Sequence, residues 1–396
     1  MNTKIPQRSV SIGFDCHKRQ HTIGILDPEG YSIGPNTSIP ITKIGFDQAR
    51  DLIETAKIKC NATKVKIGIE AASFYHLNLV SAMMTHYDDI QVFNPKLLGP
   101  GPRREVRRKK TDYKDAIVVA RALHDGIKGT MPYDDLPLLE IQELYRLKSR
   151  LTKNRSDLKK RYRRNLHVLF PGYDSVISQP FSNPSTNLLG KYPSAKTVRE
   201  ASFDDIKTAT MKKGKYGMRD RTILKVQELA RKVLDCSIYY DSLIIEQGIL
   251  LRMILNLDSE IEKVSKIGLK KWQQLNIKPK FFDLDGMSEE DGVKLYTEIG
   301  DPRRFDNVDK FVAFIGLDPI TKRSDRKVNY GHLTKMGTRY GREILGNLVM
   351  SMRLKNPQIK AVWEKARSQN RPWNECRVIC MRKLVRMIWG IENSSQ

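Results

Sequence analysis

The chain has 396 residues, of which 70 are Lys or Arg and 45 are Asp or Glu, so its formal net charge is +25 at pH 7. Hydrophobic residues make up 40% of the chain, which excludes a disordered polymer and allows two or three domains with their own cores. Basic residues occur along most of the chain, which favours a polyanionic partner, and nucleic acid is the leading candidate because Lys and Arg bind phosphates.

Three further features of the sequence bear on the cellular location of the protein. No apolar run approaches the roughly 20 residues of a transmembrane helix, so we expect no membrane partner. The first residues lack the apolar core of a signal peptide. Five cysteines in a chain of this length imply no disulfide framework. These features favour a cytoplasmic protein, which would be associated with the nucleoid when bound to DNA.

The first part of the chain, residues 1–136, alternates between strand and helix patterns. Strands are expected at 8–15, 21–30, 64–72 and 89–95, and helices at 45–58 and 74–87. The first two strands form a hairpin that closes on a Pro/Gly turn. An opening hairpin followed by alternating helices and strands predicts an α/β domain with a mixed sheet.

The remaining chain is predicted to be mostly helical. Long helices are expected over 137–168 and 219–265, separated by a loop-rich insert at 171–216. Their apolar residues fall near heptad spacing, which favours an antiparallel helical pair or a dimerisation arm, and we assign 137–270 to this region. Residues 271–396 are expected to form a compact, mostly helical basic domain.

Four carboxylates of the predicted α/β domain lie at positions where catalytic residues are expected. Asp15 and Glu70 each end a predicted strand, while Asp112 and Asp115 lie three residues apart on one face of a predicted helix. Together they suit one or two Mg²⁺ (or Mn²⁺) ions, which stabilise the attacking and leaving oxygens of a phosphodiester. Singly, each has an ordinary alternative: helix cap, turn residue or surface residue.

A run of six cations directly precedes Asp112. It would hold a nucleic-acid backbone next to the carboxylates, whereas helix capping alone leaves it unexplained. Its members are Arg103, Arg104, Arg107, Arg108, Lys109 and Lys110. His17, two residues after Asp15, has two interpretations: a neighbour of the metals, or an ordinary polar residue at a strand end, and the second is preferred. Cys376 and Cys380 are interpreted as core residues, because a zinc site needs about four ligands.

Several short motifs resemble a known family. "GFD" at 13–15, "GIEA" at 68–71 and "KTDYKDA" at 110–116 resemble the RuvC-like domain of DEDD-type insertion-sequence transposases. That family includes bridge-RNA-guided recombinases and pilin-gene DNA invertases. The resemblance continues through "NP" at 94–95 and the segments 296–319, 324–345 and 356–391. It implies an RNase H-like α/β domain, a long coiled-coil segment and a mostly α-helical C-terminal transposase domain.

The resemblance also implies roles for individual residues. Asp15, Glu70, Asp112 and Asp115 would be catalytic metal ligands. In the C-terminal domain of the family, a serine nucleophile precedes a Gly-x-x-[Ser/Thr]-Lys-x-Gly motif. That motif is formed here by Gly331, Thr334, Lys335 and Gly337, which makes Ser324 the nucleophile. Its attack would give a phosphoserine intermediate and a free 3′-hydroxyl. Developing phosphorane charge would be neutralised by Arg323, Arg326 and Lys335.

Partners follow from the same resemblance. They are donor and target DNA, a guide (bridge) RNA, and further copies of the chain in a homodimer or homotetramer. The resulting interpretation is a guide-RNA-directed transposase or site-specific recombinase.

Two alternatives stay open. A metal-only RuvC-like nuclease or resolvase would need the carboxylates but not Ser324. A catalytically inactive nucleic-acid-binding relative is the second, since Lys327 occupies a position where some relatives carry a further serine. A sugar-kinase-like phosphotransferase is set aside, because it leaves the charge of +25 unexplained.

Overall fold

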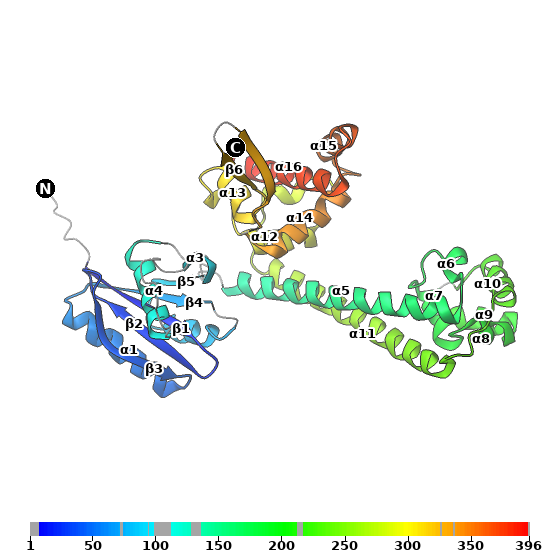
Figure 1. Ribbon diagram of the computed structural model, residues 1–396, viewed down its shortest axis with the longest axis horizontal. Coiled ribbons are helices and arrows are strands. Elements are labelled where there is room, and N and C mark those ends of the chain that lie inside the picture. The colour runs from blue at the N-terminus through cyan, green and yellow to red at the C-terminus, as the bar shows by residue number, and fades with distance from the viewer. Residues whose placement is uncertain are drawn as a thin grey trace. The chain divides into compact units, whose positions relative to one another are not determined.

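The computed structural model describes residues 8–71, 74–93, 95–98, 112–127, 136–211, 217–324, 327–335 and 337–394. The chain divides into two compact units, Met1–Leu136 and Pro137–Gln396 (Figure 1). The first is an α/β domain and the second is mostly helical, as predicted.

The first unit is built on a five-stranded mixed sheet. Its strands are β1 (Ser9–Cys16), β2 (Gln20–Leu26), β3 (Ser32–Pro40), β4 (Lys64–Glu70) and β5 (Ile90–Phe93), in the spatial order β3-β2-β1-β4-β5. The first three strands are antiparallel neighbours, whereas β4 lies parallel to both β1 and β5. The predicted antiparallel pairing of the first two strands is confirmed, but residues 17–19 connect them, and the predicted Pro/Gly turn joins β2 to β3 instead. Sequence analysis missed β3, because its prolines favour a loop; at a sheet edge they are tolerated.

Helices cover both faces of this sheet. They are α1 (Lys43–Lys59), α2 (Leu77–Met83), α3 (Pro95–Leu98) and α4 (Asp112–His124). Successive residues of β1 point to opposite faces. Val10, Ile12 and Phe14 are fully buried on the face covered by α1, and Gly13 faces α4 (Figure 1).

A row of three glycines determines how closely α4 approaches the sheet. Gly13 of β1 is paired with Gly24 of β2 on one side and with Gly68 of β4 on the other. A Cβ atom on Gly13 would lie 2.0 Å from the carbonyl oxygen of Ala116, and one on Gly24 would lie 2.9 Å from the backbone nitrogen of Ile117. The backbone of α4 therefore rests directly on Gly13 and Gly24, whereas a Cβ atom on Gly68 would meet the side chains of Val119 and Leu123.

Gly13→Ala tests this close approach. Because the added methyl group would overlap the backbone of α4, we expect a loss of about 1–3 kcal/mol in the free energy of unfolding, visible in thermal unfolding of the full chain. Gly390→Ala is the control, since a Cβ atom there meets nothing within 4 Å on helix α16 (Trp373–Asn393). Equal melting temperatures for both variants would contradict the packing described.

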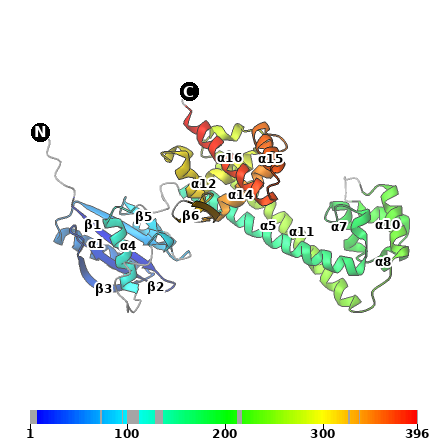
Figure 2. The same cartoon turned by 45° about the horizontal axis from the view of Figure 1, so that its top comes forward.

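The second unit contains a long antiparallel helical pair. Helix α5 (Leu136–Leu169) lies beside α11 (Tyr240–Gln273) in both views (Figures 1 and 2). Ion pairs between the two helices show that they are antiparallel. Lys271 binds Glu140 at 3.0 Å near one end, and Arg161 binds Glu246 at 3.0 Å near the other. These two helices form the arm of the second unit.

The predicted continuous helix over 219–265 is wrong. Helix α10 ends at Lys232, where Val233 becomes extended, and α11 begins only after Tyr239, whose φ of 58° is left-handed. The buried residues of α10 are Ile223, Val226 and Ala230. They pack at the tip of the arm rather than along it. The tip therefore includes α10 (Asp220–Lys232) together with α6 (Tyr173–Val176), α7 (Asn183–Lys191), α8 (Ala195–Glu200) and α9 (Phe203–Thr210). Heptad-like spacing in α10 reflects packing onto these short helices.

The C-terminal part packs around the base of the arm. Ile141 and Tyr145 of α5 share a hydrophobic core with Phe281, Phe311 and Ile388. Its elements are η1 (Lys280–Asp283), α12 (Glu289–Ile299), η2 (Pro302–Arg304), α13 (Val308–Ile315), β6 (Pro319–Ser324), β7 (Lys327–Leu333), α14 (Arg339–Met352), α15 (Pro357–Ser368) and α16. Strands β6 and β7 form an antiparallel hairpin.

Two smaller expectations are resolved by this part of the fold. Cys376 and Cys380 are fully buried, as expected for core residues. Among the helices that the structure describes, none has the length and apolar character needed to cross a membrane.

Candidate active site

Three side chains meet where β1 ends. The Asp15 carboxylate is buried, and the Nε2 atom of His17 lies 3.1 Å from its Oδ2 atom and 3.4 Å from Oδ2 of Asp112. One ligand atom from each of the three lies within 4.8 Å of the others. The close packing of α4 on the glycine row brings Asp112, the first residue described in that helix, to the strand end. The structure thus unites two of the four predicted carboxylates and adds a histidine.

The other two carboxylates lie at the same edge. The register of β1 and β4 pairs Phe14 with Ile69, so Glu70 follows beside Asp15 on the face that carries Gly68. Asp115 lies about one turn along α4 from Asp112, and its charge reaches Asp15. Strand pairing and helix packing therefore place all four predicted carboxylates in one neighbourhood.

The electrostatics of Asp15 reflect this crowding. Burial raises the pKa of its carboxyl above the ordinary value, and His17 opposes that shift. Negative charge on Asp115 and Asp112 raises the pKa further. Like charges held together and partly out of water favour protonation, unless a cation compensates them.

The donor set fits a divalent cation. Carboxylate oxygens are the ligands that Mg²⁺ and Mn²⁺ prefer, and the mutual repulsion of the Asp15 cluster is the condition that such an ion relieves. His17 offers an additional nitrogen and already contacts both aspartates. Sequence analysis did not assign His17 to this site. Its spacing of two from Asp15 was the available signal, because alternate residues of an extended chain lie on one side.

The remaining predicted residues are described only in part. Ser324 is the last residue of β6, and its backbone is paired with Lys327, the first residue of β7. Arg323 precedes it in β6, paired with Val328. Asp325 and Arg326 lie outside the described residues. So does the predicted basic run Arg103, Arg104, Arg107, Arg108, Lys109 and Lys110.

Lys335, in contrast, has a well-defined backbone. Its φ of 53° is left-handed, a conformation that costs a non-glycine residue on the order of 1 kcal/mol. The preceding Thr334 fixes the loop: its backbone N–H donates to the carbonyl oxygen of Asp318 at 3.0 Å, and its hydroxyl donates to Asp318 Oδ1 at 2.9 Å. The Lys335 side chain is exposed. A strained backbone that carries an exposed cation is typical of a functional loop.

Two models of transposase families match the chain. The transposase family of the DEDD IS110 type matches residues 12–171, and the transposase IS116/IS110/IS902 family matches residues 280–364. This chain belongs to the IS110 family of DEDD transposases. The first matched segment of the transposase contains Asp15 and Asp112, and the second contains Ser324 and Lys335. No curated protein matches the chain. Membership makes the protein a DNA transposase, an enzyme whose substrate is DNA.

His17→Ala tests the unexpected member of the cluster. Because His17 contacts both Asp15 and Asp112, its removal should weaken Mn²⁺ binding by the transposase about tenfold, measured by electron paramagnetic resonance of free Mn²⁺. His86→Ala, at an exposed histidine of the same unit, serves as the control and should bind as the wild type does. Unchanged affinity in His17→Ala would show that the histidine is not part of the metal site.

Proposed function

We propose that this transposase exchanges DNA strands under the direction of a guide RNA, through a phosphoserine intermediate on Ser324 assisted by metal bound at Asp15, Glu70, Asp112 and Asp115. The observation that carries the proposal is the convergence of Asp15, His17 and Asp112 within 4.8 Å, beside the predicted positions of the other two carboxylates. An acidic centre of this kind serves phosphodiester chemistry in a protein whose family acts on DNA.

The acidic cluster would hold one or two Mg²⁺ or Mn²⁺ ions. Such ions supply positive charge that stabilises the attacking and leaving oxygens of a phosphodiester. Buried Asp15 and half-buried Glu70 would fix the ligand geometry from the sheet, while Asp112 and Asp115 contribute from α4. His17 would orient Asp15 and Asp112 through the contacts already present.

Ser324 would carry the covalent step. Its Oγ atom attacks the phosphorus, the bond from phosphorus to the 3′-oxygen breaks, and the serine proton passes to that oxygen, leaving a free 3′-hydroxyl. The 3′-hydroxyl of another strand then attacks the phosphoserine, restoring the serine and joining the new strand. Each step exchanges one phosphoester for another, so no external energy source is needed. Ser324 is the last residue of strand β6.

Cations would neutralise the charge that develops on phosphorus. Lys335 is exposed and lies on the loop that follows the β6–β7 hairpin, which supports a direct role in neutralising this charge. Arg323 and Arg326 flank Ser324 in the sequence and would act on the same phosphate. The basic run 103–110 would hold the backbone near the carboxylates.

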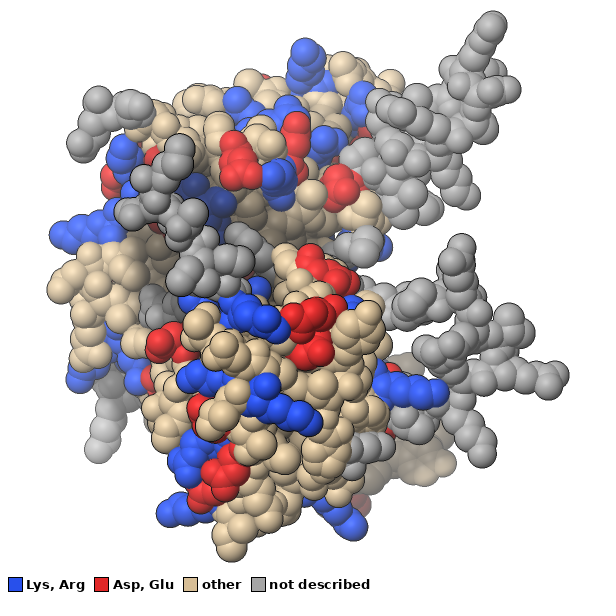
Figure 3. Space-filling view, turned by 90° about the vertical axis from the view of Figure 1, so that its left-hand side faces the viewer, with Lys and Arg blue, Asp and Glu red and all other residues tan. Residues whose placement is uncertain are grey.

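The nucleic acids would contact much of the surface. On the face drawn in Figure 3, Lys and Arg side chains are spread widely among acidic ones rather than gathered in one patch. With a net charge of +25, this distribution suits long polyanions, namely donor DNA, target DNA and a guide RNA. Recombination must hold two duplexes together, so we propose that the active assembly is a homodimer or homotetramer.

Trapping of the covalent intermediate tests the proposal. Labelled DNA with the cognate junction, guide RNA and Mg²⁺ is incubated with the protein and resolved by denaturing electrophoresis. We expect an adduct with the wild type, and its loss in both Ser324→Ala and Asp15→Ala, because one variant lacks the nucleophile and the other a metal ligand.

The other outcomes identify the alternatives. Cleavage without an adduct, unaffected by Ser324→Ala, would make the protein a metal-only RuvC-like nuclease. DNA binding with neither cleavage nor adduct would make it an inactive relative, and Lys327→Ser would then be the first reversion to examine.

Lys335→Asn separates charge from backbone conformation. Asparagine tolerates the left-handed region, so the fold of the loop and the melting temperature should persist. Loss of the cation should lower the rate of adduct formation about 100-fold. Lys365→Asn, on the exposed surface of α15, is the control and should react at the wild-type rate. Wild-type rates in Lys335→Asn would exclude Lys335 from the reaction.

A further inference from the structure

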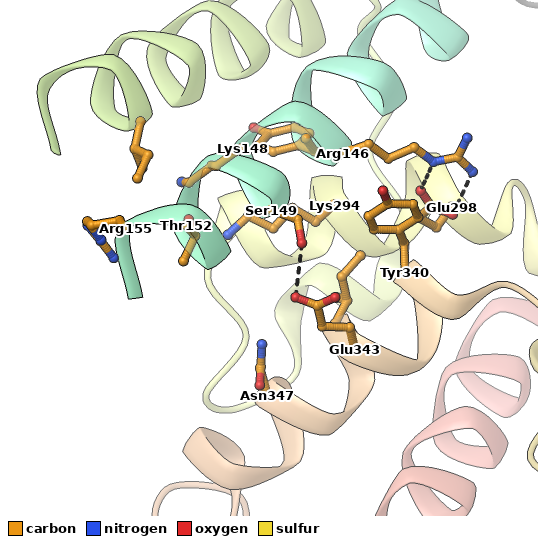
Figure 4. Close-up of a pocket in the computed structure, with 13 residues that line it drawn as sticks. Arg146, Lys148, Ser149, Thr152, Arg155, Lys294, Glu298, Tyr340, Glu343 and Asn347 are labelled. Atoms are coloured by element: carbon orange, nitrogen blue, oxygen red, sulfur yellow. Dashed lines mark hydrogen bonds and ion pairs between the residues drawn. The ribbon is translucent and has the colours of Figure 1, made fainter. Parts of the chain in front are cut away.

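The base of the arm is fastened to the C-terminal part by polar contacts from one face of α5. Gln142, Arg146 and Ser149 lie on that face because they are three or four residues apart. Gln142 Nε2 donates to the carbonyl oxygen of Thr297 at 2.6 Å. Ser149 Oγ donates to Glu343 Oε1 at 2.9 Å (Figure 4). Ser149 and Glu343, together with Arg146 and Glu298, line a pocket of about 300 Å³ between α5, α11, α12 and α14.

Glu298, near the end of α12, is the centre of these contacts. Its side chain is only 3% exposed and is held by both prongs of Arg146, at 2.6 Å from Nε and 3.1 Å from Nη2 (Figure 4). The hydroxyl of Thr338 donates to the same carboxylate at 2.8 Å. A buried ion pair adds little net stability, but a two-pronged contact is strongly directional. It therefore fixes the orientation of α5 relative to the residue before α14.

Thr338 transmits this contact to α14. It is the N-cap of that helix, and its Oγ atom accepts a hydrogen bond from the backbone N–H of Gly341 at 3.2 Å. One turn further, Arg342 extends back from the helix. Its Nη1 atom donates to the carbonyl oxygens of Ile315 and Gly337, at 2.8 Å each. The first turn of α14 is thus tied to two points outside the helix.

Those two points, Ile315 and Gly337, lie on either side of the β6–β7 hairpin in the chain, and this hairpin carries Ser324. Ile315 ends α13 before β6 begins, and Gly337 follows β7, so Arg342 closes the base of the segment that carries Ser324. Gly337 packs so closely there that a Cβ atom would lie 2.0 Å from the carbonyl oxygen of Phe314. The two hydrogen bonds from Thr334 to Asp318 fasten the same base a second time.

We infer that Glu298, Thr338 and Arg342 are positioning residues that fix the hairpin β6–β7 to the arm. A continuous set of hydrogen bonds runs from Arg146 through these three to the backbone on both sides of the hairpin. An arm held in one orientation, for instance by bound nucleic acid, then holds Ser324 in one orientation. The catalytic meaning of this linkage rests on the proposed role of Ser324, whereas the linkage itself does not.

Thr338→Asp separates the linkage from helix capping. Aspartate is as good an N-cap as threonine, so Gly341 keeps its partner. Ionised aspartate cannot donate to Glu298 and places a second negative charge beside it. Since a displacement of about 1 Å can slow a reaction roughly 100-fold, we expect adduct formation to fall by about that factor, with DNA binding unchanged.

Two variants serve as controls. Thr338→Ser keeps the hydroxyl, so it should form the adduct at the wild-type rate. Asn307→Ala removes the N-cap of α13 in the same domain, where Asn307 accepts from the Lys310 N–H but contacts no residue of the path above. It should lower the melting temperature and leave adduct formation unchanged. A merely stabilising role for Thr338 predicts instead that Asn307→Ala loses the adduct as well.

Hydrogen exchange of the hairpin amides gives a readout that does not depend on chemistry. In the full chain without DNA, we expect the amides of 320–324 and 327–333 to exchange about tenfold faster in Thr338→Asp than in Thr338→Ser or Asn307→Ala. Unchanged exchange in Thr338→Asp overturns the inference. If the wild type forms no adduct on Ser324, the proposed function fails, while the exchange rates still decide the linkage. If Thr338→Asp does not fold, Arg342→Met, which removes the donor and keeps the side-chain length, is measured in its place.

Discussion

The contact between α4 and the glycine row is the constraint on which the acidic site depends. A helix can bring its first turn to the end of β1 only if its backbone lies directly on the sheet. Gly13 and Gly24 provide that surface on two adjacent strands, and Gly68 on the next strand leaves room for the α4 side chains. Asp15 then meets Asp112 and His17, and the charge repulsion within the cluster follows from their closeness. The site is therefore a consequence of missing side chains in the sheet as much as of the carboxylates themselves.

The C-terminal part solves a similar positioning problem by different means. Its hairpin is a two-stranded sheet, which has little stability alone, so the surrounding structure must hold its base. Arg342 does so from α14, and Glu298 connects that helix to the arm. Sterics position the carboxylates of the first unit, whereas directional hydrogen bonds position the hairpin of the second. In both parts of the protein the backbone is held in place, and the side chains are positioned as a consequence.

Much of this architecture was predictable from the sequence, and the failures have physical causes. Alternation and turn residues located the buried strands around Asp15 and Glu70, and the heptad-like pattern located α5. The edge strand β3 was missed because its prolines favour a loop in the absence of a neighbour. The break before Tyr239 was missed because the apolar spacing of α10 serves a different partner, the tip helices. The spacing of His17 from Asp15 was visible in the sequence, but its contact with Asp112 depends on where α4 packs, so it was not assigned to the site.

The most direct test of the central claim is to identify the residue that becomes joined to DNA. Adduct from wild-type protein, cognate DNA, guide RNA and Mg²⁺ is digested, and the nucleotide-bearing peptide is sequenced by mass spectrometry. The account predicts a phosphodiester on Ser324, formed only when Asp15 is intact. A nucleotide on any other residue, or an adduct that persists in Asp15→Ala, would contradict it.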